Sequence, residues 1–272
     1  MAEFRIFPDI RLIVGKADNI GLENGIEISF CKSGICEYAV GNEYYYLTAE
    51  NCIILRRGAD RESRISYSSD YCGISLLIDS CYNGKAFEEL LDMSDILRNM
   101  QSCEQCIFSA DDNIKRLSSE IYDTFSTSML RIKVLELLMI MGEKRCTAGE
   151  KSERIRKIGS FVCKNLCEHY TIAKLSEIFA IDRTTLKILF RQTFGCPVYT
   201  YAKNRKMFRA AELLRDTEMK IIDIAEEVGY CNASKFSGAF RDVMGIAPKT
   251  FQMERKNTRK YKNRTISAKF AY

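Results

Sequence analysis

The chain has 272 residues, 46% of them hydrophobic and 28% charged, which is typical of a globular protein with a buried core and room for about two domains. Its strongest apolar run, residues 135–141, is far shorter than the ~20 residues that cross a membrane. The first residues contain no basic leader followed by an apolar stretch. We therefore expect a cytoplasmic protein without a membrane partner, whose twelve cysteines stay reduced and mostly lie in the core.

The charge divides unequally along the chain. Residues 1–150 carry 16 basic and 24 acidic side chains, a net charge of −8, whereas residues 151–272 carry 25 basic and 12 acidic ones, a net charge of +13. A basic excess of this size favours a polyanion such as nucleic acid as the partner of the second half.

The first eighty residues are rich in strand-forming residues. Residues 25–79 alternate β-branched and aromatic residues with turns such as the one at Gly41, a pattern that predicts a β-sandwich or small barrel. Residues 111–125 and 129–143 then carry apolar residues at helical spacing. The second of these helices is apolar over most of its surface, so we expect it to be buried against the barrel or against another subunit.

A polar segment, residues 142–154, contains two glycines and shows no period, so the domain boundary is predicted there, between domains 1–148 and 149–272. After Glu254 the chain has no acidic residue and seven basic ones; this tail is either disordered and solvated or a phosphate anchor. Between the boundary and the tail the pattern predicts only helices, at residues 155–168, 172–179, 182–194, 198–214, 221–228 and 232–244.

Residues 175–245 contain two segments that match each other at an offset of fifty residues. Asp182 and Asn232 are both good helix N-caps. Gly195 and Gly245 stand where a helix ends in the left-handed conformation. Two helix-turn-helix units with matching caps, cores and ends indicate DNA binding in a half-chain as basic as this one. The other equivalent positions are Ile178 and Val228, Leu186 and Phe236, Phe190 and Phe240, and Arg191 and Arg241.

The same periodicity turns one face of each second helix outward. Leu186, Leu189 and Phe190 are expected in the core, so the opposite face carries basic and hydroxyl side chains, which suit phosphates and base edges in the major groove. Residues 197–215 predict a helix of about 27 Å, a rigid spacer between units that enter major-groove segments about 34 Å apart. The candidate DNA-contacting residues are Arg183, Thr184, Thr185, Lys187, Ile188 and Arg191 in the first unit and Asn232, Ala233, Ser234, Lys235, Ser237, Gly238 and Arg241 in the second.

Four motifs stand in the last hundred or so residues: "LKILFRQTFG", "NRKMFRAAELL", "IIDIAEEVGY" and "FRDVMGIAPKTFQ". With these motifs, the last hundred or so residues resemble the DNA-binding domain of the AraC/XylS family of bacterial transcription regulators. The last motif contains four residues that belong to the family's pattern: Phe240, Gly245, Pro248 and Phe251. The segments "TTLKILFRQTFG" and "GYCNASKFSGAF" are similar to the PchR-like subtype. The chain departs from the family at Ile188 and Gly238, where arginine is frequent, so the family's contact roles transfer poorly to these two positions.

The sequence offers little for metal or cofactor chemistry, and neither is predicted. The single histidine is His169, so the acidic half lacks the clustered histidines of a metal cupin. We expect His169 to interact with the carbonyls at a helix end. Cys103 and Cys106 form a C-x-x-C motif, and Cys163 and Cys167 lie four residues apart on a helix. Either pair could bind metal or sense oxidation, or arise by chance among twelve cysteines.

Aromatic and basic side chains gather on the predicted strands. Tyr44, Tyr45, Tyr46, Tyr67 and Tyr71 form either core and surface, or part of a ligand cavity in which an arginine meets an anionic group. The candidate arginines are Arg56, Arg57, Arg61 and Arg64.

The family resemblance implies an α+β protein: an N-terminal cupin-like β-sandwich or barrel with following helices, then an all-α DNA-binding domain of two helix-turn-helix units joined by a linker helix. It implies double-stranded DNA, a small-molecule effector and RNA polymerase as partners, and a possible homodimer formed by domain 1–148. We predict a sequence-specific transcription regulator, an activator controlled by the effector, and not an enzyme. The alternatives are a ligand-independent regulator controlled by abundance or a protein partner, and a β-sandwich enzyme with a basic accessory domain.

Overall fold

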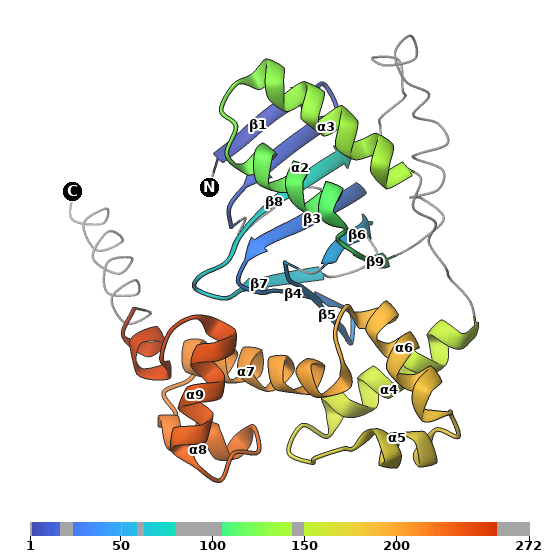
Figure 1. Cartoon of the computed structure of the whole chain (residues 1–272). Helices are drawn as coiled ribbons and strands as arrows, with labels where there is room; N and C mark the ends of the chain where they lie inside the picture. The colour runs from blue at the N-terminus through green and yellow to red at the C-terminus, as the bar shows by residue number, and fades with distance from the viewer. Residues whose placement is uncertain are drawn as a thin grey trace, which may run out of the picture.

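The computed structural model describes residues 2–16, 24–49, 51–58, 63–79, 105–142 and 150–254. The N-terminal half consists of two β-sheets with two covering helices, and the C-terminal half is helical (Figure 1). The predicted α+β class and the order of its parts are confirmed. None of the described helices is long and apolar enough to cross a membrane.

The larger sheet has six strands in the described part of the chain, in the order β1-β2-β8-β3-β6-β9, and every neighbouring pair is antiparallel. This order places strands that are distant in sequence side by side, so hydrophobic alternation alone does not reveal it. The strands are β1 (Ala2–Phe7), β2 (Ile10–Val14), β3 (Gly25–Ser33), β6 (Asn51–Arg57), β8 (Cys72–Asp79) and β9 (Gln105–Ser109).

The smaller sheet is antiparallel, in the order β5-β4-β7, and packs against the larger one to form a sandwich. Strand β6 shows how the two cores are separated. Ile53 and Leu55 contribute to the core between the sheets, whereas Cys52 and Ile54 contribute to the core on the other face, because alternate residues of a strand point to opposite sides. The turn before β5 has Gly41 at φ 58°, as the sequence predicts. The strands are β4 (Cys36–Val40), β5 (Glu43–Leu47) and β7 (Ser63–Tyr67).

Two helices, α2 (Asp112–Tyr122) and α3 (Thr127–Gly142), cover the outer face of the larger sheet (Figure 1). Met129, Ile132 and Met139 on the opposite face of α3 are about half exposed. Burial against the barrel is therefore confirmed for one face, no described residue covers the other, and contact of that face with another subunit stays a prediction. The face of α3 that packs on the sheet carries Leu130, Val134, Leu137, Leu138 and Met141.

The C-terminal half has the six predicted helices, five of which begin and end within two residues of the prediction. The exception is α4, which begins inside the segment predicted as a linker and ends four residues early. The predicted domain boundary between residues 148 and 149 lies outside the described residues. The helices are α4 (Glu150–Lys164), α5 (Ile172–Ile178), α6 (Arg183–Phe194), α7 (Val198–Asp216), α8 (Ile221–Glu227) and α9 (Ala233–Met244).

The duplication is confirmed in the second helix of each unit. Asp182 caps α6 and Asn232 caps α9, each by accepting a hydrogen bond from a backbone N–H three residues later. Both helices end at a left-handed glycine, Gly195 with φ 78° and Gly245 with φ 79°.

The turns of the two units differ by one residue. Residues 179–182 join α5 to α6, whereas residues 228–232 join α8 to α9. The first helices therefore match at an offset of 49 residues, and the predicted equivalence of Ile178 and Val228 is wrong. Ile178 is 44% exposed, and Val228 is buried.

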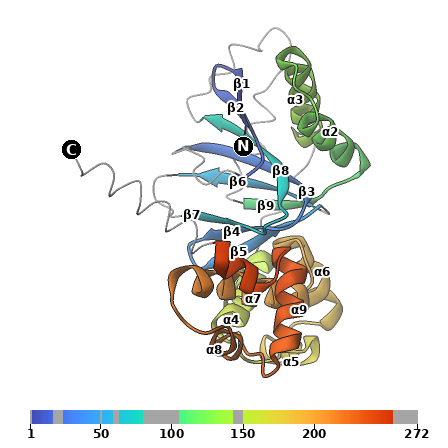
Figure 2. The ribbon, with the colours of Figure 1, turned by 90° about the vertical axis from the view of Figure 1, so that its left-hand side faces the viewer.

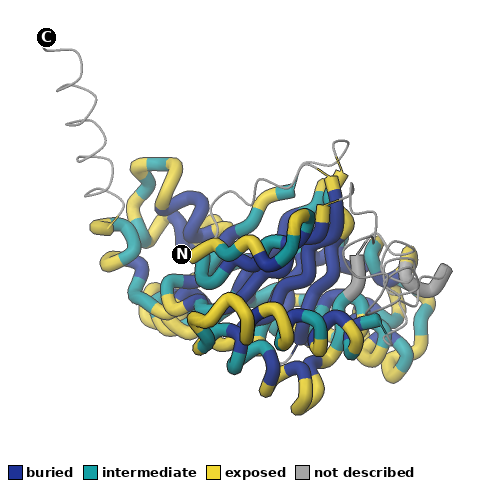
Figure 3. Tube along the Cα trace, turned by 90° about the horizontal axis from the view of Figure 1, so that it is seen from above, coloured by how far each residue is buried: buried dark blue, intermediate teal, exposed yellow. Residues whose placement is uncertain are grey.

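One hydrophobic core runs from the smaller sheet into the helical half. Figure 2 shows the helices beneath β4 and β5, and β5 lies against α4, α6 and α7. Tyr45 stacks on Phe194 at 5.6 Å, and Tyr46 lies edge-on to Tyr201 at 5.5 Å between ring centroids. The buried residues form a continuous band through the strands (Figure 3). The two halves are therefore packed together, and the linker helix α7 is part of their shared core.

Candidate nucleic-acid interface

Helix α6 presents the first candidate DNA-contacting face. The Asp182 side chain accepts a hydrogen bond from the backbone N–H of Thr185 at 2.9 Å, and this contact lowers the pKa of the Asp182 carboxyl. Leu186 and Phe190 are fully buried beneath the helix, whereas Leu189 is half-buried. The opposite face is exposed and carries Arg183, Thr184, Lys187, Ile188 and Arg191; Thr185 is half-buried.

Helix α9 presents the second face. Asn232 accepts a hydrogen bond from the backbone N–H of Lys235 at 2.9 Å, and Phe236 and Phe240 are fully buried. A methyl group added at Gly238 would meet no atom within 4 Å, so the helix surface is open to close approach there. A shallow hollow of about 430 Å³ on this face is lined by Ala233, Ser234, Ser237, Gly238 and Arg241, of which Ser237 alone is half-buried.

The basic side chains of both faces are available for an external anion. They make no ion pair with any described residue, whereas nearby Lys174 and Lys203 pair with Glu177 and Asp242. An unpaired, exposed cation can meet a phosphate without first losing a protein partner. The basic residues concerned are Arg183, Lys187, Arg191, Lys235 and Arg241.

The linker helix carries a buried charge cluster that sequence reasoning missed. Arg205 on α7 lies 3.3 Å from the carboxylate of Glu37 on β4. It also lies 3.3 Å from the carboxylate of Glu212, seven residues further along α7. Its guanidinium also lies 4.0 Å from the ring centroid of Tyr44. The only sequence signal was a pair of charged residues, seven apart, on the side of α7 that also carries its apolar residues.

Glu37 is the point where the β-rich half holds the linker helix. Its side chain is 2% exposed and accepts a hydrogen bond from the Tyr46 hydroxyl at 2.7 Å. Burial raises the pKa of Glu37 to about 7, against the opposing attraction of Arg205. Arg64 on β7 donates to Glu212 at 3.0 Å, so both halves contribute charges of both signs. Removing one partner of such a cluster leaves a buried charge without compensation.

The β-rich half also contacts the C-terminal ends of α6 and α9, the two candidate recognition helices. The Asn51 side-chain amide donates to the Gly195 carbonyl at 3.2 Å, directly after α6. The backbone N–H of Ser69 donates to the Met244 carbonyl at 2.7 Å, at the end of α9. A Cβ on Gly245 would lie 2.8 Å from the Asp70 carboxyl, so the approach is close there as well. The two helices are therefore held at one end, while their N-terminal turns stay exposed.

The tyrosines of the N-terminal half lie in two environments. Tyr45 and Tyr46 are buried and pack on the helices, as core residues. Tyr44 and Arg64 line a cavity of about 420 Å³ between the smaller sheet and helices α4 and α7, together with Lys164, Arg205, Arg209 and Glu212.

The candidate arginines also lie in different environments. Arg57 forms an ion pair with buried Glu27, whose carboxylate also accepts hydrogen bonds from Ser29 and Tyr38. Arg56 is exposed, and Arg61 lies outside the described residues. Only Arg64 among them therefore lines the cavity.

The cysteines and the histidine form no described metal site. Cys103 lies outside the described residues, and no group of three or more potential ligands occurs within them. Burial raises the pKa of Cys163 to about 11, so this thiol is poorly suited to redox chemistry. His169 was expected at a helix end, but it lies five residues beyond Lys164, the end of α4, with its ring 6.4 Å from that of Tyr199.

Comparison with known proteins adds independent evidence. Residues 175–254 match HTH_18, a helix-turn-helix domain. The chain is 26% identical over 226 residues to the lactose operon transcription activator of Staphylococcus xylosus, covering 79% of each protein. It is 28% identical over 129 residues to the virulence regulon transcriptional activator VirF of Yersinia enterocolitica, covering 44% of this chain and 46% of VirF.

A solved structure of ToxT from Vibrio cholerae aligns with 90% of this chain and 98% of its own, at 16% identity and a TM-score of 0.38. The PchR-like subtype stays a prediction. The relatives are regulators rather than enzymes, as the sequence predicts for this chain. The duplicated helix-turn-helix units, the motifs that run through them and these relatives lead to one conclusion: residues 175–254 form a helix-turn-helix domain, and the chain is similar to transcription regulators of the AraC/XylS family.

Proposed function

We propose that the chain is a sequence-specific activator of transcription that binds duplex DNA through α6 and α9. One observation carries the proposal: both helices present exposed cationic and hydroxyl faces with no described ion-pair partner. Nineteen residues in α7 correspond to about 28 Å, which suits two successive major-groove segments. RNA polymerase as a partner, pairing of two chains and a cytoplasmic location are proposals that rest on the resemblance to the AraC/XylS family.

The two faces suggest a division of labour. Lys187 and Arg183 with Thr184 supply donors for base edges in the first unit, so α6 is proposed to discriminate the sequence. Helix α9 offers Arg241 with small side chains, so it is proposed to bind phosphates and set the register.

Control is proposed to act through the contact between the halves, with residues 1–148 as the sensor domain and 149–272 as the DNA-binding domain. Glu37, Asn51 and Ser69 hold the linker helix and the ends of both recognition helices. An effector in the cavity beside Tyr44 and Arg64 would favour the arrangement for which its affinity is higher, since a ligand shifts an equilibrium only by differential affinity.

A salt series with the full chain tests DNA binding. Fluorescence anisotropy on a duplex selected from a randomised library, and on random duplex, should give affinities that fall steeply with salt. Arg241→Ala should weaken binding to the selected duplex and to random duplex alike. It should also lower the slope of log affinity against log salt concentration by about one. Lys157→Ala on α4, which removes the same charge away from both faces, is the control. A flat salt response, or an equal effect of the control, would contradict the proposal.

A further inference from the structure

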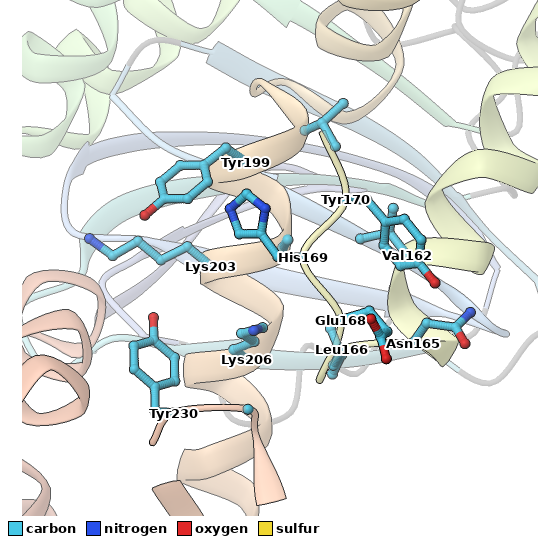
Figure 4. Close-up of a pocket in the computed structure, with 13 residues that line it drawn as sticks. Val162, Asn165, Leu166, Glu168, His169, Tyr170, Tyr199, Lys203, Lys206 and Tyr230 are labelled. Atoms are coloured by element: carbon cyan, nitrogen blue, oxygen red, sulfur yellow. The ribbon is translucent and has the colours of Figure 1, made fainter. Parts of the chain in front are cut away.

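A second cavity, of about 220 Å³, lies where α4 and the loop after it meet the linker helix α7 and the turn of the second helix-turn-helix unit. Its walls come from three segments: the end of α4 with the following loop, the first turns of α7, and the turn after α8. Figure 4 shows Tyr199, Lys203 and Lys206 projecting from α7, His169 beside Tyr199, and Tyr230 near Lys206. The cavity thus joins α4, which packs on α6 of the first unit, to the linker helix and to the second unit.

The lining combines aromatic rings with one cation that lacks an acidic partner. The Lys206 ammonium lies 5.5 Å from the ring centroid of Tyr230 and forms no ion pair with a described residue. Lys206 is half-buried, and burial lowers its pKa, so its charge is poorly compensated by water. Lys203 differs, because it pairs with Asp242 at 3.0 Å. A bound anion would restore the compensation that Lys206 lacks.

The size and shape of the lining limit the ligand. A volume of about 220 Å³ equals roughly seven water molecules at ~30 Å³ each, which suits a single ring with a short substituent. The rings of Tyr199 and His169, whose centroids lie 6.4 Å apart and whose planes are inclined at 53°, offer aromatic surface to a ligand. Glu168 also lines the cavity, but its side chain is exposed and forms no ion pair with a described lysine.

We propose that this cavity binds a small monocyclic aromatic carboxylate, with its ring against Tyr199 and Tyr230 and its carboxylate on Lys206. The site lies wholly within the DNA-binding half, so it is distinct from the effector cavity beside Tyr44 and Arg64. A ligand here contacts α4 and its loop, the linker helix and the turn of the second unit, and it fixes the second unit relative to α4, the helix on which α6 packs. It would therefore alter DNA binding without any change in the sensor domain.

Titration of the full-length protein with benzoate, followed by amide chemical shifts, tests the proposal. Benzoate should perturb the resonances of Gly229, Tyr199 and Lys206, and benzamide, the neutral counterpart, should bind about tenfold more weakly. Lys206→Met keeps the aliphatic stem, removes the charge and should reduce benzoate affinity to that of benzamide. Glu168→Gln should increase benzoate affinity, because it removes the repelling carboxylate.

Two controls distinguish the loss of benzoate binding in Lys206→Met from a general loss of structure or of positive charge. Lys157→Met, on the exposed surface of α4, should leave benzoate binding unchanged. Thermal unfolding of Lys206→Met should match wild type without ligand. Equal affinities for benzoate and benzamide, an unchanged affinity in Lys206→Met, or perturbations confined to the sensor domain would overturn the proposal. None of these outcomes depends on whether the sensor responds to an effector.

Discussion

The two helix-turn-helix units share a framework and differ in the surface that they expose. Both recognition helices have an Asx N-cap, a pair of buried residues on one face and a left-handed glycine at the end. At equivalent positions on the outer face, Lys187 and Ile188 of α6 stand where α9 has Ser237 and Gly238. Folding constrains the inner face of such a repeat, while the outer face is free to diverge in function.

The largest effect expected concerns the shared framework. Phe190→Ala and Phe240→Ala each remove a fully buried ring, so each should lower the free energy of unfolding by about 3–5 kcal/mol. Urea unfolding of the two variants measures the cost. Ile188→Ala, at an exposed position on α6, should change it by no more than ~0.5 kcal/mol. A cost under about 1 kcal/mol in only one unit would show that the frameworks are not equivalent.

The next effect concerns Glu37, which holds the helix that joins the units. A carboxyl whose pKa is raised from 4.5 to about 7 binds more protons when folded, so its contribution to stability is full below pH 4.5 and is lost as pH rises through 7. Between about pH 5 and pH 8, wild type should therefore lose stability relative to Glu37→Gln, by on the order of 1–3 kcal/mol. Unfolding curves across pH check this, and parallel pH profiles would contradict it.

A smaller effect is expected where the two units differ. Lys187→Ala should weaken binding to the selected duplex by about 1–3 kcal/mol and relax the preference at one or two base pairs. Ser237→Ala, the equivalent change in α9, should leave the preferred sequence unchanged. Selection from randomised duplexes with both variants makes the comparison. If only Ser237→Ala alters the selected sequence, the division of labour between the units is reversed.

The smallest effect concerns Gly238, where the added methyl group meets open space. Gly238→Ala should stabilise the fold by about 0.5–1 kcal/mol, because alanine loses less backbone entropy in a helix. Gly159→Ala in α4 is the contrasting variant, since its Cβ would lie 2.4 Å from the Phe194 ring. It should destabilise the protein, as thermal unfolding can verify. A stabilising Gly159→Ala would show that the packing between α4 and α6 is loose.

In the helical half, short-range sequence signals were enough to predict where the helices begin and end. Asp182, Asn232, Gly195 and Gly245 mark helix ends through contacts with neighbouring residues, so the sequence pattern predicted the boundaries closely. The turn was less well predicted, because Ala180 takes a left-handed conformation in the first unit where Gly229 does so in the second. An offset of fifty throughout therefore hid the extra residue of the second turn.

Contacts between residues far apart in the sequence could not be predicted from the sequence pattern. Arg205 stands on the buried side of α7 because Glu37, more than 160 residues earlier, meets it there, and Glu212 pairs with Arg205 in turn. Periodicity reports which face of a helix is apolar, but it does not report what lies opposite. For the same reason the pattern predicted the strands but not their order, and it left the roles of Tyr45 and Tyr46 open.

The hydrogen bonds at the ends of α6 and α9 have a consequence for the DNA itself. Asn51 and Ser69 belong to the same sandwich, so their two hydrogen bonds together set the separation of Gly195 and Met244. A duplex whose half-sites demand another separation can be bound only if one of these contacts breaks. Because coupling between sites is reciprocal, such a duplex would change the affinity of the sensor for its effector by the same factor. The spacing of the half-sites then acts as an effector in its own right.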